Sequence, residues 1–137
     1  MGINNLLIAS VFATGISSIA VQIITVREFL TQFSGNEITI SLVLFCWLMI
    51  GGLGSLVSKS FQKRSASLYS MIALLTAVFA LIQITAIRVL RDIAFIHGES
   101  PGFFPVFLFV LTLSAPYAFL IGFILPHALA VIRERER

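Results

Sequence analysis

QIITVREFLTQFSGNEITISLVLFCWLMIGGLGS, residues 22–55, contains two apolar segments joined by a charged turn. The first segment ends on Arg27 and Glu28, a Ser-Gly-Asn break follows at 34–36, and Glu37 opens the second segment. Charged side chains are costly in hydrocarbon, so they gather where a chain leaves the membrane. The stretch therefore predicts two membrane spans joined by a tight turn.

The whole chain has the composition of an integral membrane protein. Of its 137 residues, 58% are hydrophobic and 11% are charged, whereas soluble domains have about 25% charged residues. Four apolar runs approach the ~20 residues that cross a hydrocarbon core, and backbone groups in lipid must be satisfied within a helix. We expect an all-α membrane protein in which residues 1–137 form one domain of four transmembrane helices. The expected spans are about 5–33, 37–58, 67–92 and 103–132.

The fourth span is long and contains two prolines, Pro116 and Pro126. Proline removes a backbone hydrogen bond and tends to kink a helix, so we expect a kinked fourth helix. Ser114 and Tyr117 are placed to satisfy backbone groups freed near Pro116. The run 103–109 contains four phenylalanines and predicts a surface that faces lipid or a partner.

Lys and Arg residues are distributed unevenly between the expected loops. Arg27, Arg88 and Arg91 lie beside one set of span ends. Six basic residues lie beside the other set: Lys59, Lys63, Arg64, Arg133, Arg135 and Arg137. Short loops rich in Lys and Arg stay cytoplasmic, which predicts that both termini are cytoplasmic and that the turns at 34–36 and 93–102 are outside. The expected location is the cytoplasmic (inner) membrane of a bacterium or archaeon, with the first span as a retained signal anchor.

Small residues recur at helical spacing in two of the spans. Ser10, Thr14 and Ser18 repeat every four residues in the first span, as do Ala9, Ala13 and Ser17 beside them. The second span has three glycines near its inner end, at positions 51, 52 and 54. Small residues let helix backbones approach closely in a membrane. We expect the small-residue faces to pack within the bundle, with a homodimer face as the alternative, and the glycines to serve close helix packing.

The charges at the outer ends of the spans form one predicted cluster. It consists of Arg27, Glu28, Glu37, Arg88, Arg91 and Asp92, with His97 and Glu99 in the following loop. Charged groups at the edge of the hydrocarbon pair with one another or face protein and water. We therefore predict ion pairing, for example Arg27 with Glu37, and keep a docking surface or small polar pocket for an external partner as the alternative.

Gln22 is the predicted intramembrane polar site. It lies inside the first span, whereas the middles of the spans contain no Asp, Glu, Lys or Arg. A transporter usually has a polar residue or a broken helix near the middle of the membrane. Gln22 fits that description, but a glutamine between helices also serves as a hydrogen-bonding residue.

The sequence predicts no catalytic, metal or cofactor site. Bis-histidine haem needs two histidines that face each other at similar depth, yet His97 is expected outside and His127 near the inner end of span 4. Cys46 is the single cysteine, which excludes a disulfide framework within the chain. No His–acid pair is placed to activate a serine.

Several of these residues carry a resemblance to a known family. They are Gln22, Arg27-Glu28-Phe29-Leu30, Gly35-Asn36-Glu37, Ser41-Leu42-Val43-Leu44, Trp47-Leu48, Gly52, Gly54, Ser55, and APYAFLIGFILP at 115–126. In this order they resemble the membrane region of spermidine-synthase-like proteins, in which a membrane part is fused to an aminopropyltransferase-like domain. Because no residue of that catalytic domain matches here, the resemblance implies a membrane module separate from the enzyme.

The function that we predict is a non-enzymatic integral membrane subunit that anchors or scaffolds a larger membrane complex. Its expected partners are other membrane subunits, lipid, and an external domain or protein, but not nucleic acid; a homo-oligomer stays open. One alternative is an oligomeric or two-part transporter component for a polyamine or other organic cation, attracted by Glu28, Glu37, Asp92 and Glu99. A second alternative is a quinone-site subunit of a redox complex.

Overall fold

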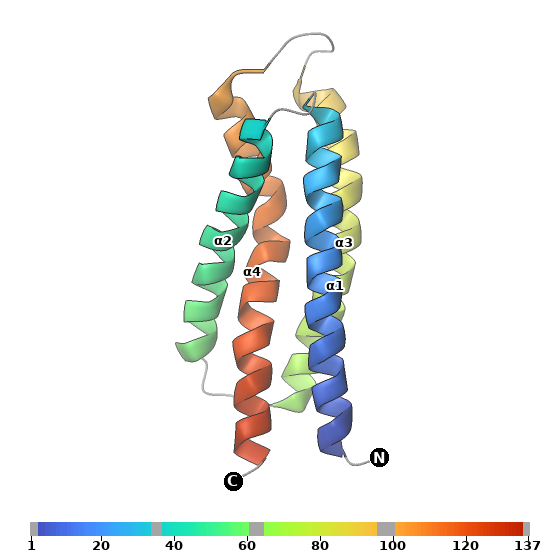
Figure 1. Ribbon diagram of the computed structural model, residues 1–137, viewed down its shortest axis with the longest axis vertical. Helices are drawn as coiled ribbons and strands as arrows, with labels where there is room; N and C mark the ends of the chain where they lie inside the picture. Colours follow the sequence, from blue (N-terminus) through green and yellow to red (C-terminus); the bar gives the residue numbers. More distant parts are fainter. Residues whose placement is uncertain (1–2, 34–36, 61–64, 96–100, 136–137) are drawn as a thin grey trace.

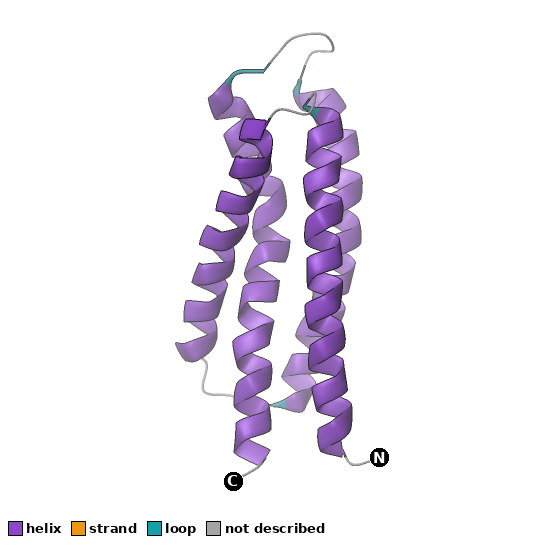
Figure 2. Ribbon diagram, viewed as in Figure 1, coloured by secondary structure: helices purple, strands orange, loops and turns teal. Residues whose placement is uncertain are grey.

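The described residues form four long helices that lie side by side (Figure 1). The computed structural model describes residues 3–33, 37–60, 65–95 and 101–135. The helices are α1 (Ile3–Gln32), α2 (Glu37–Ser60), α3 (Ala66–Ala94) and α4 (Phe103–Arg135). Figure 2 shows that regular structure in these residues is helical throughout. The expected all-α fold is confirmed: the described residues form four helices, each long and apolar enough to span a membrane.

Each helix has the length and composition to cross a membrane. The shortest, α2, has 24 residues and is roughly 36 Å long at 1.5 Å per residue, more than the ~30 Å hydrocarbon core. Large apolar side chains point away from the bundle on every helix, for example Phe12, Leu48 and Leu81. An apolar exterior suits lipid rather than water, so the fold indicates a multi-pass membrane protein.

The helices form two parallel pairs. In Figure 1, α1 and α3 run away from the end that holds both termini, whereas α2 and α4 run back towards it. We call this the terminal end, and the opposite end, where α1 and α3 finish, the charged end. Helix α4 packs along α2 and also against α3, and α1 contacts the other three helices. No Cα–Cα distance within 8 Å joins α2 to α3 in the described part of the chain.

The closest helix contact is between α2 and α4. A Cβ atom added to Gly122 would collide with the backbone of Gly51, and one added to Gly54 would collide with the backbone carbonyl of Phe119. Gly51 itself has room for a Cβ, at 3.5 Å from the Ala118 carbonyl oxygen. Gly52 faces away and would meet nothing within 4 Å. The predicted glycine packing is therefore confirmed for Gly51 and Gly54, whereas Gly52 takes no part in it.

Helix α4 continues as a helix through Pro116 and Pro126. The prediction that Ser114 satisfies a freed backbone group is wrong, since its buried hydroxyl has no hydrogen-bond partner. Tyr117 packs its ring against Trp47, with 5.3 Å between the ring centroids. The phenylalanine run divides in two: Phe103 and Phe104 are exposed, as predicted, while Phe109 packs inward against other aromatic rings.

We predict that Gly122→Ala destabilises the protein by about 1–3 kcal/mol, the usual cost of overpacking. Gly54→Ala should behave in the same way, because each new methyl group would meet backbone of the partner helix. Gly52→Ala is the matched control: its methyl group has free space and alanine gains up to about 1 kcal/mol of helix propensity. The free energy of unfolding in mixed detergent micelles measures all three. Equal losses for Gly122→Ala and Gly52→Ala would contradict the close contact.

Candidate functional site

An ion pair joins α1 to α3 at the charged end. Arg88 donates from Nε to Glu28 Oε2 at 2.8 Å and from Nη2 to Glu28 Oε1 at 2.6 Å. A bidentate pair of this kind is the strong form of an arginine–carboxylate interaction, and it fixes the orientation of both groups. The Glu28 side chain is 13% exposed and Arg88 is 61% exposed, so the pair lies at the bundle surface.

The other predicted cluster residues do not all converge on this pair. Arg91, one turn after Arg88, donates to the neighbouring Asp92 at 3.3 Å. Arg27 and Glu37 are both exposed. Ion pairs between described side chains join Glu28 to Arg88 and Arg91 to Asp92, so the pair that links two helices is Glu28–Arg88 rather than the predicted Arg27–Glu37. His97 and Glu99 lie outside the described residues.

A buried polar contact joins the same two helices deeper in the bundle. The Gln83 side-chain amide on α3 donates from Nε2 to the Thr25 hydroxyl on α1 at 2.9 Å. Thr25 is fully buried and Gln83 is 3% exposed. The predicted polar site, Gln22, is half-buried one turn earlier on α1. The sequence shows Gln83 as a polar residue in an apolar span, but nothing in it indicates Thr25 as its partner.

An aromatic cluster lies at the same end of the bundle as the ion pairs. Phe29 of α1 and Phe33, the residue after α1 ends, pack against Phe109 of α4, and Phe33 and Phe109 both contact Phe95 after α3. The ring centroids in these four contacts lie 5.3–6.3 Å apart, in the edge-to-face geometry that aromatic pairs prefer. The charged end is therefore held by rings from three segments as well as by charges.

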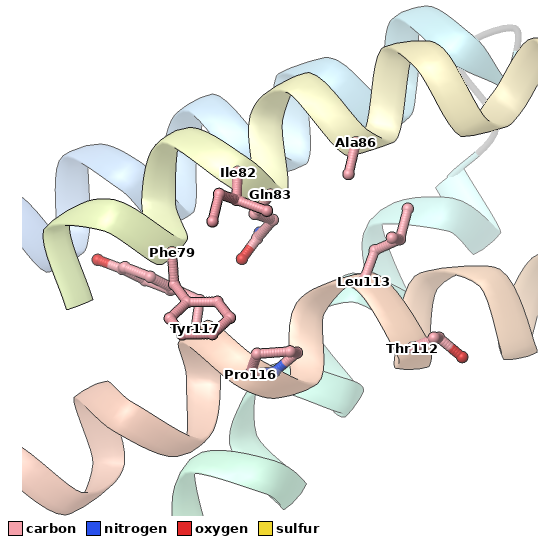
Figure 3. Close-up of a pocket in the computed structure, with 8 residues that line it drawn as sticks. All are labelled: Phe79, Ile82, Gln83, Ala86, Thr112, Leu113, Pro116 and Tyr117. Atoms are coloured by element: carbon pink, nitrogen blue, oxygen red, sulfur yellow. The ribbon is translucent and has the colours of Figure 1, made fainter. Parts of the chain in front are cut away.

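A small pocket opens between α3 and α4 next to the Thr25–Gln83 contact. Its volume is about 80 Å³, and Figure 3 shows its lining residues: Phe79, Ile82, Gln83, Ala86, Thr112, Leu113, Pro116 and Tyr117. Ile82, Thr112 and Pro116 are exposed, so the pocket opens sideways towards the surface that faces lipid. The sequence singled out Pro116 but gave no sign of a pocket beside it.

Polar groups are also buried towards the terminal end. The Thr14 and Tyr69 hydroxyl oxygens lie 3.1 Å apart and join α1 to α3. His127 of α4 is buried with Nε2 unpartnered, and the Ser58 hydroxyl of α2 is likewise buried without a hydrogen-bond partner. No group of three or more His, Cys, Asp or Glu side chains that could hold a metal occurs in residues 3–33, 37–60, 65–95 and 101–135. His97 lies outside the described residues, so its expected separation from His127 stays a prediction.

In comparisons with known proteins, no family model, no curated protein and no solved structure matches the chain. The resemblance to spermidine-synthase-like membrane regions therefore stays a prediction. The chemistry that the described residues offer is ion pairing at the charged end and hydrogen bonding inside the bundle. Both features link α1 to α3.

We predict that Glu28 and Arg88 are energetically coupled by about 0.5–1 kcal/mol, as expected for an ion pair at a protein surface. A double-mutant cycle with Glu28→Ala and Arg88→Ala in detergent micelles measures this coupling, which should fall as salt is added. The control cycle uses Arg88→Ala with Glu37→Ala, because Glu37 is exposed on α2 and no Cα–Cα distance within 8 Å joins α2 to α3 in the described residues. The assignment fails if the control cycle gives the larger coupling.

Proposed function

We propose that this protein is a non-enzymatic integral membrane subunit that scaffolds a larger complex by binding another membrane helix along α1. The observation that carries the proposal is a row of small residues on α1 that the bundle leaves uncovered. Ala9, Ala13 and Ser17 are exposed, although small residues at this spacing are typical of close helix contacts in membranes. Their expected packing within the bundle is not observed.

The neighbouring row on α1 behaves differently and supports this assignment. Ser10, Thr14 and Ser18 are half-buried, and Thr14 contacts the Tyr69 hydroxyl of α3. One face of α1 thus holds the helix to the bundle, while the adjacent face is free to meet a partner. A second copy of the chain and a different membrane subunit are both partners of suitable chemistry.

The orientation of the chain in the membrane, its location and the kink in α4 are part of the same proposal. Both termini lie at one end of the bundle (Figure 1), and the excess of basic residues beside that end supports a cytoplasmic placement. We propose the inner membrane of a bacterium or archaeon as the location, with a kink in α4 at its prolines. The transporter and quinone-site alternatives stay predictions. Glu28 is less suited to attract a cation than predicted, because Arg88 already neutralises its charge.

We predict that Ala13→Leu reduces binding to the partner at least tenfold, because a large side chain would hold two helix backbones apart. Ala77→Leu is the matched control, since Ala77 is an exposed alanine on α3. Tagged variants are purified from native membranes in mild detergent, and the proteins that accompany each are quantified by mass spectrometry. A second, differently tagged copy in the same cells reports self-association.

The expected result is loss of a partner, or of the second copy, with Ala13→Leu and its retention with Ala77→Leu. Equal amounts of every accompanying protein in the wild type and in both variants would contradict the proposal. Circular dichroism of each purified variant confirms that the helices remain folded.

A further inference from the structure

The pocket between α3 and α4 contains an acceptor atom that the protein leaves unpartnered. Gln83 is 3% exposed, and its Nε2 atom is bound to the Thr25 hydroxyl. Its Oε1 atom is buried without a hydrogen-bond partner and points into the space between the two helices in Figure 3. A buried carbonyl oxygen without a donor is unfavourable, so a ligand that supplies a donor gains from binding there.

Pro116, which lines the same pocket, leaves one backbone carbonyl of α4 without its usual donor. Proline has no N–H group, so the Thr112 carbonyl lacks its usual donor from four residues later. Both residues line the pocket. The hydroxyl groups of Thr112 and Tyr117 point away from Gln83 in Figure 3. The acceptor that the pocket presents is therefore Gln83 Oε1, which selects for a ligand that donates.

The rest of the lining determines what else the ligand must be. Phe79, Ile82 and Leu113 are apolar and the Tyr117 ring completes the wall beside Phe79 (Figure 3). Buried water usually makes about three hydrogen bonds, more than this wall provides. An apolar molecule with a single strong donor suits it better, and aromatic side chains favour an aromatic ring.

We propose that this pocket binds a membrane-soluble phenol, whose hydroxyl donates to Gln83 Oε1 while its ring lies against Phe79 and Tyr117. The volume of about 80 Å³ is roughly half that of an engineered cavity that holds benzene. The pocket therefore takes the hydroxyl and one edge of the ring, and the remainder of the ligand stays in lipid. The lateral opening allows entry from the bilayer.

The test compares p-cresol with its methyl ether, p-methylanisole, which has the same ring but no donor. The full chain is placed in lipid nanodiscs, and binding is followed by the fluorescence of Trp47, the single tryptophan, which packs against Tyr117. Partition into empty nanodiscs is subtracted. We expect p-cresol to bind about three- to tenfold more tightly, the ratio that one hydrogen bond supports.

Two variants connect that preference to the pocket. Gln83→Leu should abolish the difference between the two ligands, whereas Gln22→Leu, the same change at a half-buried glutamine outside the pocket, should preserve it. Ala86→Leu fills the pocket without touching the Thr25–Gln83 bond and should abolish binding of both ligands. Its control is Ala77→Leu, on the same helix outside the pocket lining.

Three results would overturn the proposal. These are no saturable binding of p-cresol, equal or tighter binding of p-methylanisole, and a phenol preference that survives both Gln83→Leu and Ala86→Leu. Circular dichroism shows whether each variant keeps its helix content. If Gln83→Leu or Ala86→Leu loses helix, the conclusion is drawn from the other of these two variants.

Discussion

The close approach of α2 and α4 at three glycines is the constraint on which the rest of the bundle depends. Gly51, Gly54 and Gly122 let one backbone touch the other, and any larger side chain at Gly54 or Gly122 would separate them. In lipid, where apolar surface gives helices little reason to associate, such contacts supply the packing. Because α2 covers the face of α4 that carries Gly122, α3 and α1 contact other faces of α4.

Helix α1 is held in a different way. Near the charged end it is bound by the Glu28–Arg88 ion pair, the Thr25–Gln83 bond and the aromatic rings around Phe29, and nearer the terminal end Thr14 contacts the Tyr69 hydroxyl. Over the rest of its length most of its side chains are exposed or half-buried. Contacts along one face hold α1 to the bundle and leave the adjacent face open to a partner, which is why the proposed scaffold function centres on α1.

The sequence predicts the helices well, but it predicts poorly which residues of different helices contact one another. Length and apolar composition determine four spans, and the glycines of α2 indicate a close contact. Pairing depends on how helices rotate against one another, which no local pattern contains. Glu28 rather than Glu37 forms the ion pair between helices, and Gln83 rather than Gln22 forms the deeper polar contact. The pocket is likewise a product of packing, since its walls come from two helices.

The central claim, that α2 and α4 meet through the Gly51 face, is tested most directly by disulfide cross-linking within one chain. In a Cys46→Ala background, Gly51→Cys is combined with Ala118→Cys, because a Cβ at position 51 would lie 3.5 Å from the Ala118 backbone oxygen. Rapid cross-linking of this pair under mild oxidation is expected, and slow or no cross-linking when Gly52→Cys replaces Gly51→Cys. Equal rates for the two pairs, or faster cross-linking through position 52, would contradict the helix contact and the architecture built on it.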